Sequence, residues 1–262
     1  MGIRFASLGS GSEGNSLLVE ARSGTTVTRV LLDCGFSLKE TERRLARLSV
    51  ELGELDAVLI THEHADHIGC GLTLARRAAI PIYMSWGTSQ ALKASPSVLE
   101  QVDLRLCANA APISLGDLHI LPYTVPHDAR EPLQFTFTDG AKRLGVLTDI
   151  GAGTSHVTQV LNACDALVLE CNHDKQMLAQ SRYPSSLKAR IGGSHGHLSN
   201  EAAAGILAAL DRSRLRYLIA AHLSQQNNTA ALAEQALAEV LGTEPVELVI
   251  ANQEDGFSWL ST

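Results

Sequence analysis

The chain has 262 residues, of which 45% are hydrophobic and 19% are charged. A chain of this length and composition can bury a large core, which excludes an intrinsically disordered protein and favours a single domain over residues 1–262. The formal net charge of −7 argues against a protein that attracts nucleic acid through a broad basic surface. Any such attraction must therefore be local.

No apolar run approaches the length that a membrane span needs, and the first ten residues resemble a strand opening rather than a secretory signal. We therefore expect no membrane contact and a cytoplasmic location. The five cysteines are odd in number and contain no CxxC pair, which is typical of reduced thiols.

Apolar runs and helical patterns alternate along the chain, as is typical of an α/β fold. In the first part, strands are expected at residues 3–8, 17–21, 27–33, 56–60 and 81–84, and helices at 38–48, 68–79 and 87–94. In the second part, strands are expected at 104–107, 118–125, 133–138, 143–148, 166–169, 217–221, 247–251 and 257–260, and helices at 154–163, 174–180, 200–210 and 229–241. The glycine- and serine-rich residues 9–16 form a turn. It is either a plain turn or a backbone cradle for a phosphate, although it lacks the lysine of a P-loop.

The strand at residues 56–60 runs directly into Thr-His-Glu-His-Ala-Asp-His at 61–67. His62 and His64 are two residues apart, so on an extended segment they point the same way and could chelate one metal ion. Asp66 and His67 follow where the chain enters a helical pattern, and they could serve a second ion. The alternative is a surface loop that is rich in histidine by chance.

Four later apolar runs also finish in a residue that can bind a metal or move a proton. These residues are His127, Asp149, Glu170 and His222. Side chains that follow parallel strands gather outside one edge of a sheet. The sequence therefore predicts one site assembled from five strand ends.

The motif HxHxDH at residues 62–67 resembles the signature of the metallo-β-lactamase superfamily, and within it the chain looks most like the WalJ/YycJ group, relatives of ribonuclease Z and ribonuclease J. Further stretches carry the resemblance in the same order over nearly the whole chain: SGSEGNS at 10–16, PHDA at 126–129, TDIG at 148–151, ECNHD at 170–174, YP at 183–184, GHLSN at 196–200 and HLSQQNN at 222–228. Glu13 departs from the pattern, which has a second serine there, and its negative charge weakens a phosphate-binding role for the turn.

The resemblance implies a four-layer αββα sandwich made of two similar βα halves, with a dinuclear metal site at one edge. It implies that His62, His64 and His127 hold one ion, that Asp66, His67 and His222 hold a second, and that Asp149 bridges the two. The ions would be divalent, and histidine and carboxylate ligands suit Zn²⁺, Mn²⁺ or Fe²⁺. A hydroxide that bridges the ions would be the nucleophile, with Asp66 and Asp149 as part of the catalytic centre.

The same resemblance implies further roles around the metals. Glu170 and His197 would handle the proton for the leaving oxygen, or support the metal ligands through hydrogen bonds. His195 and His173 would share that task or contact phosphate, and Asn172 and Ser199 would contact the substrate or order the backbone. Arg182, Lys188 and Arg190 form a small basic group that is either an exposed helix face or a contact with the phosphate backbone.

We therefore expect a metal-dependent phosphodiesterase acting on nucleic acid, in particular a 5′-to-3′ exonuclease with DNA favoured over RNA. One alternative is a hydrolase of the same fold acting on a thioester, a lactone or a cyclic phosphodiester, which the acidic charge and the few aromatic residues favour. The other is a regulatory module that binds metal without catalysis. A homodimer is among the assemblies that we expect.

Overall fold

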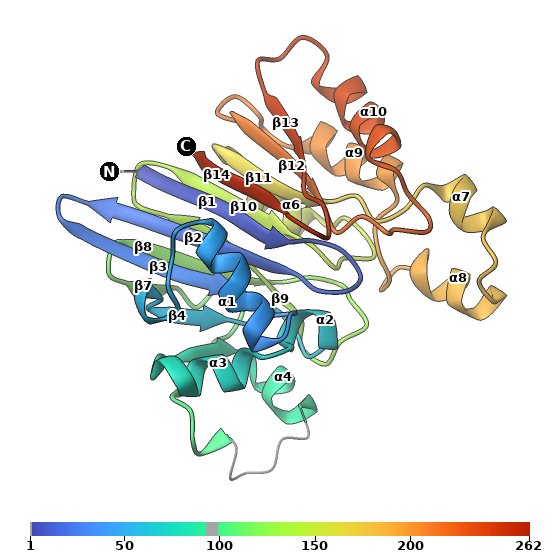
Figure 1. Ribbon diagram of the computed structural model, residues 1–262. Coiled ribbons are helices and arrows are strands. Elements are labelled where there is room, and N and C mark those ends of the chain that lie inside the picture. Colours follow the sequence, from blue (N-terminus) through green and yellow to red (C-terminus); the bar gives the residue numbers. More distant parts are fainter. Residues whose placement is uncertain (1, 93–98) are drawn as a thin grey trace.

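The computed structural model describes residues 2–92 and 99–262. Within them, two seven-stranded sheets pack face to face (Figure 1). The first sheet has the order β14-β1-β2-β3-β4-β5-β6, with bounds Phe257–Ser261, Gly2–Gly9, Ser16–Ser23, Thr26–Leu32, Ala57–Leu59, Ile82–Met84 and Leu104–Leu106. The second has the order β13-β12-β11-β10-β9-β8-β7, with bounds Glu247–Ile250, Tyr217–Ala221, Ala166–Glu170, Arg143–Leu147, Leu133–Thr138, Leu118–Thr124 and Ile113–Leu115.

Helices cover the outer face of each sheet. The described helices are α1 (Leu38–Arg47), α2 (Ala65–Ile68), α3 (Gly71–Ala78), α4 (Trp86–Ala91), α6 (Ser155–Leu161), α7 (Lys175–Gln180), α8 (Ser185–Ile191), α9 (Asn200–Ala209) and α10 (Ala230–Leu241), with a 3₁₀ turn η1 at Leu52–Glu54. Apolar residues of α1 and α3 pack on the first sheet, and those of α6, α9 and α10 pack on the second. The predicted four-layer αββα sandwich is confirmed.

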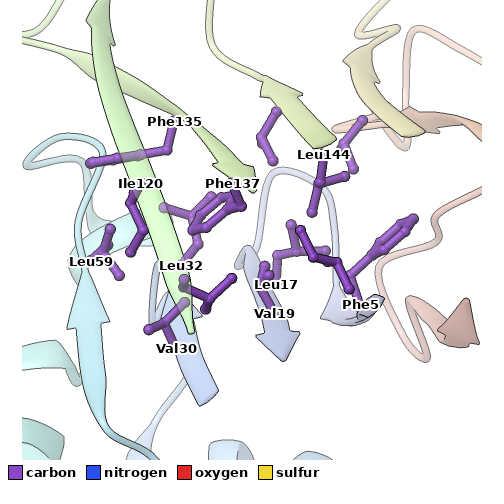
Figure 2. Close-up of a cluster of buried hydrophobic side chains, with 14 of the residues drawn as sticks. Phe5, Leu17, Val19, Val30, Leu32, Leu59, Ile120, Phe135, Phe137 and Leu144 are labelled. Carbon is purple, nitrogen blue, oxygen red and sulfur yellow. The ribbon is translucent and has the colours of Figure 1, made fainter. Parts of the chain in front are cut away.

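The central core lies between the two sheets, and both sheets supply its side chains (Figure 2). Phe5, Leu17 and Leu32 come from the first sheet, and Ile120 and Phe137 from the second; each is no more than 7% exposed. The central strands β4, β10, β11 and β12 therefore bury both faces, one against the other sheet and one against helices. This explains why they read as continuous apolar runs rather than as an alternating pattern.

The sheet topology brings the predicted strand ends to one edge. In the second sheet β10, β11 and β12 are parallel neighbours, and in the first sheet β3, β4 and β5 are parallel neighbours. Because parallel strands end on the same side, the residues that follow these strands meet at a shared rim. In Figure 1, α7 and α8 extend away from the sandwich, beyond α9.

The prediction of one helix over residues 68–79 is wrong in its first residues, because the helix that covers most of this range, α3, begins only at Gly71. The structure has two helices there, α2 and α3, separated at Gly69, whose φ is +29°. The strand β7 and the helix α8 were not predicted. The predicted helix at 87–94 is present as α4, and its last two residues, 93 and 94, lie outside the described residues.

None of the helices in the described part of the chain is both long enough and apolar enough to cross a membrane.

Candidate metal centre

The HxHxDH motif begins at His62, three residues after the end of β4, and continues into α2. His62 is completely buried in the turn, His64 is the N-cap of α2, and Asp66 and His67 lie within that helix. The short helix α2 turns the chain, so that Asp66 and His67, four and five residues after His62, face the same centre as His62. The motif thus uses an extended segment and then one helical turn to aim its side chains.

Residues from the second sheet complete the cluster. The potential ligand atoms form two sets, and within each set they lie within 4.8 Å of one another. The first set comes from His62, His64 and His127, and the second from Asp66, His67 and His222. Asp149 lies between these sets. Its carboxylate is 3.1 Å from Nε2 of His67, 3.8 Å from Nε2 of His127 and 3.7 Å from Nε2 of His222. The structure brings together all seven residues that were expected to hold metal.

The buried imidazoles are held by hydrogen bonds from Nδ1. His62 donates to Thr61 Oγ1 at 2.9 Å, His67 to Asp33 Oδ2 at 2.8 Å, and His127 to the carbonyl oxygen of Gly196 at 3.1 Å. His222 donates to Glu170 Oε1 at 3.0 Å. Each ring therefore keeps Nε2 for the centre of the cluster, which is how proteins orient histidine ligands.

The unused nitrogens test whether these residues fit a metal. Nε2 of His62 and Nε2 of His222 are buried, and neither has a hydrogen-bond partner among the described residues. A buried polar atom without a partner is costly, and a divalent cation bound at each of the two nitrogens would satisfy them. His64 differs, because its Nδ1 faces Nε2 of His127 at 3.4 Å. Imidazole nitrogens and carboxylate oxygens in this arrangement fit a divalent transition metal.

Three residues of the site adopt a backbone conformation that is unusual for a side chain with a Cβ atom. Asp33, Asp149 and His222 have φ values of 60°, 51° and 56°. Asp33 and His222 directly follow the parallel strands β3 and β12, and Asp149 follows β10 after one intervening residue. The left-handed conformation reverses the chain at the strand end and costs roughly 1–3 kcal/mol, a strain that proteins concentrate at functional sites.

Glu170 is the main hydrogen-bond acceptor beneath the cluster. It is 0% exposed and accepts from the backbone N–H groups of Asp149, Ile150 and Leu198 at 3.0–3.2 Å, as well as from Nδ1 of His197 at 2.8 Å and Nδ1 of His222. Burial raises the pKa of its carboxyl, but His197 and the other hydrogen bonds outweigh this and hold the pKa at about 2. The carboxylate is therefore ionised and enclosed.

His197 lies at the surface of the cluster. Its side chain is 21% exposed, and its ring centroid is 5.4 Å from that of His127 and 5.2 Å from that of His222. Burial lowers the pKa of His197, but Glu170 and Asp149 reverse this effect and raise it above the usual value. A groove of about 310 Å³ contains this ring together with Asp66, Asp149 and Arg190.

The residues expected to contact the substrate differ in their burial: three are buried and one, His195, is exposed. Asn172 is buried and donates from Nδ2 to the carbonyl oxygen of His222 at 3.1 Å, while also lining the groove. His173 and Ser199 are buried and paired through a β-bridge on the far side of His197. The side chain of His195 is exposed and contacts Ser194, and no hydrogen bond within the described residues joins its ring to the cluster.

Several supporting residues were not identified from the sequence. Asp33 accepts from His67, Thr61 links Asp33 to His62, and Asn15 places Nδ2 3.2 Å from Nε2 of His67. Ser10 Oγ accepts from the backbone N–H of His222 at 2.8 Å. Asp33 carried a signal, because it ends a predicted strand in the same way as the recognised residues.

Comparisons with known proteins agree with this geometry. A family model described as "Beta-lactamase superfamily domain" matches residues 28–222. Exodeoxyribonuclease YycJ of Bacillus anthracis is 35% identical over 92% of this chain and 90% of its own length. Exodeoxyribonuclease WalJ of Streptococcus pneumoniae is 34% identical over 92% of this chain and 89% of its own.

A solved structure shares the fold over the full length of both chains. The metallo-β-lactamase fold protein YhfI of Bacillus subtilis superposes with a TM-score of 0.74 at 18% identity, covering 100% of each chain. The family model, the similarity along nearly the whole chain and the shared sandwich all lead to one assignment. The chain belongs to the metallo-β-lactamase superfamily.

Proposed function

We propose that this protein is a metal-dependent phosphodiesterase that removes nucleotides from the end of a nucleic-acid strand, with DNA as the favoured substrate and digestion from 5′ to 3′. The observation that carries the proposal is the set of buried imidazoles whose Nε2 atoms face one centre while their Nδ1 atoms are already bonded. The names of the two bacterial relatives support the class of substrate.

We propose the following ligands for two divalent ions, Zn²⁺ or Mn²⁺ being preferred and Fe²⁺ allowed. His62, His64 and His127 hold the first, Asp66, His67 and His222 hold the second, and Asp149 contacts both. Such ions, when bound, acidify a shared water and offset the negative charge that develops on the phosphate oxygens. The two sets of ligand atoms described above support this division.

His197 is the proposed proton donor to the departing 3′-oxygen. Its ring lines the groove, and its Nδ1 is fixed by Glu170, so the opposite edge of the ring is available to a leaving group. Glu170 is fully enclosed and is therefore a positioning residue, which orients His197 and His222 without touching the substrate. His195 stays a proposed substrate contact at the rim.

The test compares wild type with His197→Ala on DNA and RNA strands labelled at the 5′ or the 3′ end, in Mn²⁺ or Zn²⁺. Loss of a general acid is expected to lower kcat about 10²–10⁴-fold while the metal content is unchanged. Asp149→Ala should lower both activity and metal content. His119→Ala is the matched control, because that histidine is exposed on β8, away from the cluster.

The results also separate the alternatives. If wild type cuts no polymer but hydrolyses a simple phosphodiester or a thioester, the proposed substrate is wrong and the small-molecule hydrolase stands. If metal binds and nothing is hydrolysed, the non-catalytic module stands.

Location and assembly are part of the proposal. We propose that the protein works in the cytoplasm, where its nucleic-acid substrate is found. A homodimer stays a prediction that sedimentation of the purified chain would check.

A further inference from the structure

Two cysteines, Cys34 and Cys70, lie next to each other on the helix-covered face of the first sheet. The backbone N–H of Cys70 donates to the carbonyl oxygen of Cys34 at 3.0 Å, and the two thiol groups share a hydrogen bond. Both residues pack in the same apolar cluster. Residues joined by a backbone hydrogen bond have Cα atoms within the span that a disulfide bridges. We call these two residues the thiol pair.

The two thiols differ in their access to solvent. Cys34 is 0% exposed, whereas Cys70 is partly exposed and has its Sγ atom 3.6 Å from Oγ1 of Thr41. Cys70 is also the N-cap of α3, and the N-terminus of a helix stabilises a thiolate. The hydrogen bond from Cys34 lowers the pKa of Cys70 to about 7, although burial acts in the opposite direction. A small oxidant in solution therefore reaches the more acidic thiol first, with a second thiol directly behind it.

The other three cysteines lack these properties. Cys107, Cys164 and Cys171 are each no more than 6% exposed. Burial raises the pKa of Cys107 to about 12 and that of Cys164 to about 11, and it also raises the pKa of Cys171. Because a thiol reacts with oxidants as the thiolate, these three are expected to be inert.

The thiol pair is connected to the metal centre through two backbone segments. Cys34 directly follows Asp33, whose Oδ2 accepts from Nδ1 of His67 at 2.8 Å. The N–H of Cys34 donates to the carbonyl oxygen of His67 at 2.7 Å, and Cys70 follows α2, the helix that carries His67. At Gly69 a Cβ atom would lie 2.2 Å from the carbonyl oxygen of Cys34, so the two segments are packed without spare room. A change in the distance between the two sulfur atoms therefore acts on a proposed metal ligand.

We propose that the thiol pair is a site of reversible oxidation, at which a hydroperoxide converts Cys34 and Cys70 to a disulfide and thereby weakens metal binding. The effect on the metal rests on the proposed ligand set, and the disulfide itself does not. In the first step the thiolate of Cys70 attacks hydrogen peroxide, so that an S–O bond forms, the O–O bond breaks and hydroxide leaves, taking up the proton that Cys70 had released.

In the second step the sulfur of Cys34 attacks the sulfenic acid of Cys70. An S–S bond forms, the S–O bond breaks, and the departing hydroxide takes the proton of Cys34. In total the two thiols lose two electrons and two protons, and the peroxide becomes two molecules of water.

The disulfide is expected to weaken metal binding because it shifts the backbone on both sides. A covalent bond draws two sulfur atoms closer together than a hydrogen bond does. Cys34 and Cys70 must therefore move towards each other, and the contact at Gly69 forces the backbone around them to adjust. The hydrogen bond from His67 to Asp33 then lengthens. Loss of such an outer partner lowers the affinity for metal about 10–100-fold.

The experiment treats the Zn²⁺-loaded chain with hydrogen peroxide, Zn²⁺ being chosen because it has no redox chemistry of its own. Wild type is expected to lose the mass of two hydrogen atoms and to yield one linked pair of peptides that contain Cys34 and Cys70. Its affinity for Zn²⁺, measured by competition with a chelator, should fall at least about tenfold. Dithiothreitol should restore both the mass and the affinity. Oxidised methionine is not restored by a dithiol, so the reversal identifies the disulfide as the cause.

Cys70→Ser and Cys107→Ser are the matched variants, since each replaces one thiol by a hydroxyl and only Cys70 belongs to the thiol pair. Cys70→Ser should keep its affinity for Zn²⁺ after peroxide, and Cys107→Ser should lose it as wild type does. Each variant is compared with itself before and after peroxide, so a lower stability does not imitate the result. Where a variant fails to fold, the peptide map and the reversal in wild type still decide. Equal protection in both variants would contradict the assignment to the thiol pair.

The remaining outcomes separate this inference from the proposed function, because neither mass nor metal affinity depends on digestion of a strand. If peroxide forms no link between Cys34 and Cys70, the inference is overturned while the exonuclease function stands. If the link forms and the affinity for Zn²⁺ is unchanged, the connection to the metal centre is refuted. A chain that loses Zn²⁺ reversibly but digests no nucleic acid would refute the exonuclease function and leave the thiol pair as a redox site.

Discussion

Asp33 shows how much of the metal centre depends on a residue that touches no metal in the proposed ligand set. Its Oδ2 accepts from Nδ1 of His67, and its Oδ1 accepts from the backbone N–H of Thr61 at 2.9 Å. Asp33→Asn removes the negative charge. It also replaces one accepting oxygen with an NH₂ group, which cannot accept a hydrogen bond from His67 or from Thr61. We expect metal affinity to fall about 10–100-fold, as it does when such outer partners are lost.

The measurement for Asp33→Asn is metal content after dialysis against a graded series of chelator concentrations. Asp56→Asn is the control, since that carboxylate accepts from the backbone N–H of Arg29 and lies outside the cluster. Unchanged metal retention in Asp33→Asn would show that the hydrogen bond to His67 does not support a ligand.

The residues of the site could be predicted from the sequence where the strand ends themselves carried the chemistry. His127, Asp149 and His222 each follow an apolar run, and a sheet edge brings them together without any knowledge of the loops. Asn15 and Ser10 could not be found in this way, because their contacts join segments separated by 52 and 212 positions. Such pairs depend on how the turn at residues 9–16 packs under the cluster.

At the scale of the elements, Gly69 ends α2 and lets the chain turn into α3. A Cβ atom there would lie 2.2 Å from the carbonyl oxygen of Cys34, and φ is +29°. Gly69→Ala should therefore displace α2, which carries Asp66 and His67, and lower the free energy of unfolding by about 1–3 kcal/mol. Urea denaturation and metal analysis together would measure both effects.

Gly53 provides the comparison for Gly69. A Cβ atom at Gly53 meets no atom within 4 Å, so Gly53→Ala should leave metal content unchanged. Equal behaviour of the two variants would contradict a role for Gly69 in placing α2.

The elements that were missed have physical explanations. The break at Gly69 follows from a close approach to the backbone of Cys34, and local periodicity contains no trace of that contact. The strand β7 has only three residues at the edge of its sheet, too few for a pattern. The helix α8 has no buried residue, so it has no apolar stripe to reveal it.

The first three strands are also joined by a buried carboxylate. Glu20 on β2 is 0% exposed and is bonded to Arg4 at 2.5 Å, to Arg22 at 2.5 Å and to Arg29 at 2.7 Å. Burial raises the pKa of Glu20, but the hydrogen bonds from the three arginines outweigh it and lower the pKa to about 2. Because the folded pKa lies below the unfolded value, this contribution to stability is complete above the unfolded pKa and is lost as the pH falls towards 2.

Glu20→Gln should therefore lower the free energy of unfolding by about 3 kcal/mol at pH 7, and the difference from wild type should shrink between pH 4.5 and about pH 2. Urea denaturation of both proteins at several pH values measures this. Glu54→Gln is the control, because Glu54 also pairs with Arg29, at 2.8 Å, but its side chain is 42% exposed, so this change should lower the free energy of unfolding much less than Glu20→Gln does. A difference that does not change with pH would rule out ionised Glu20 as its source.

At the scale of the whole molecule, the two halves share one core and one metal centre. Side chains from both sheets pack together between the layers, and the proposed ligands come from the edges of both sheets. The last strand, β14, also returns to pair with β1, the first strand of the chain. The organisation of residues 1–262 as one domain stays a prediction, and a shared core requires that both halves unfold together.

The positions of the two tryptophans allow this prediction to be tested directly. Trp86 begins α4 and Trp259 lies in β14, so intrinsic fluorescence reports on the half that contains the first sheet. Ile120 is 1% exposed on β8 of the second sheet, and Ile120→Val removes one buried methyl group, at a cost of about 0.5–1.5 kcal/mol.

If the halves form one cooperative unit, Ile120→Val should lower the midpoint temperature of the fluorescence transition by about 2–4 °C for each kcal/mol of unfolding free energy that is lost. Calorimetry should then show a single peak with the same shift. The change would then be reported by tryptophans on the opposite sheet, because removing packing from either face of the shared core weakens both. If the fluorescence transition stays in place while a second calorimetric peak moves to lower temperature, the sheets unfold separately. The chain would then consist of two domains that meet at the metal centre.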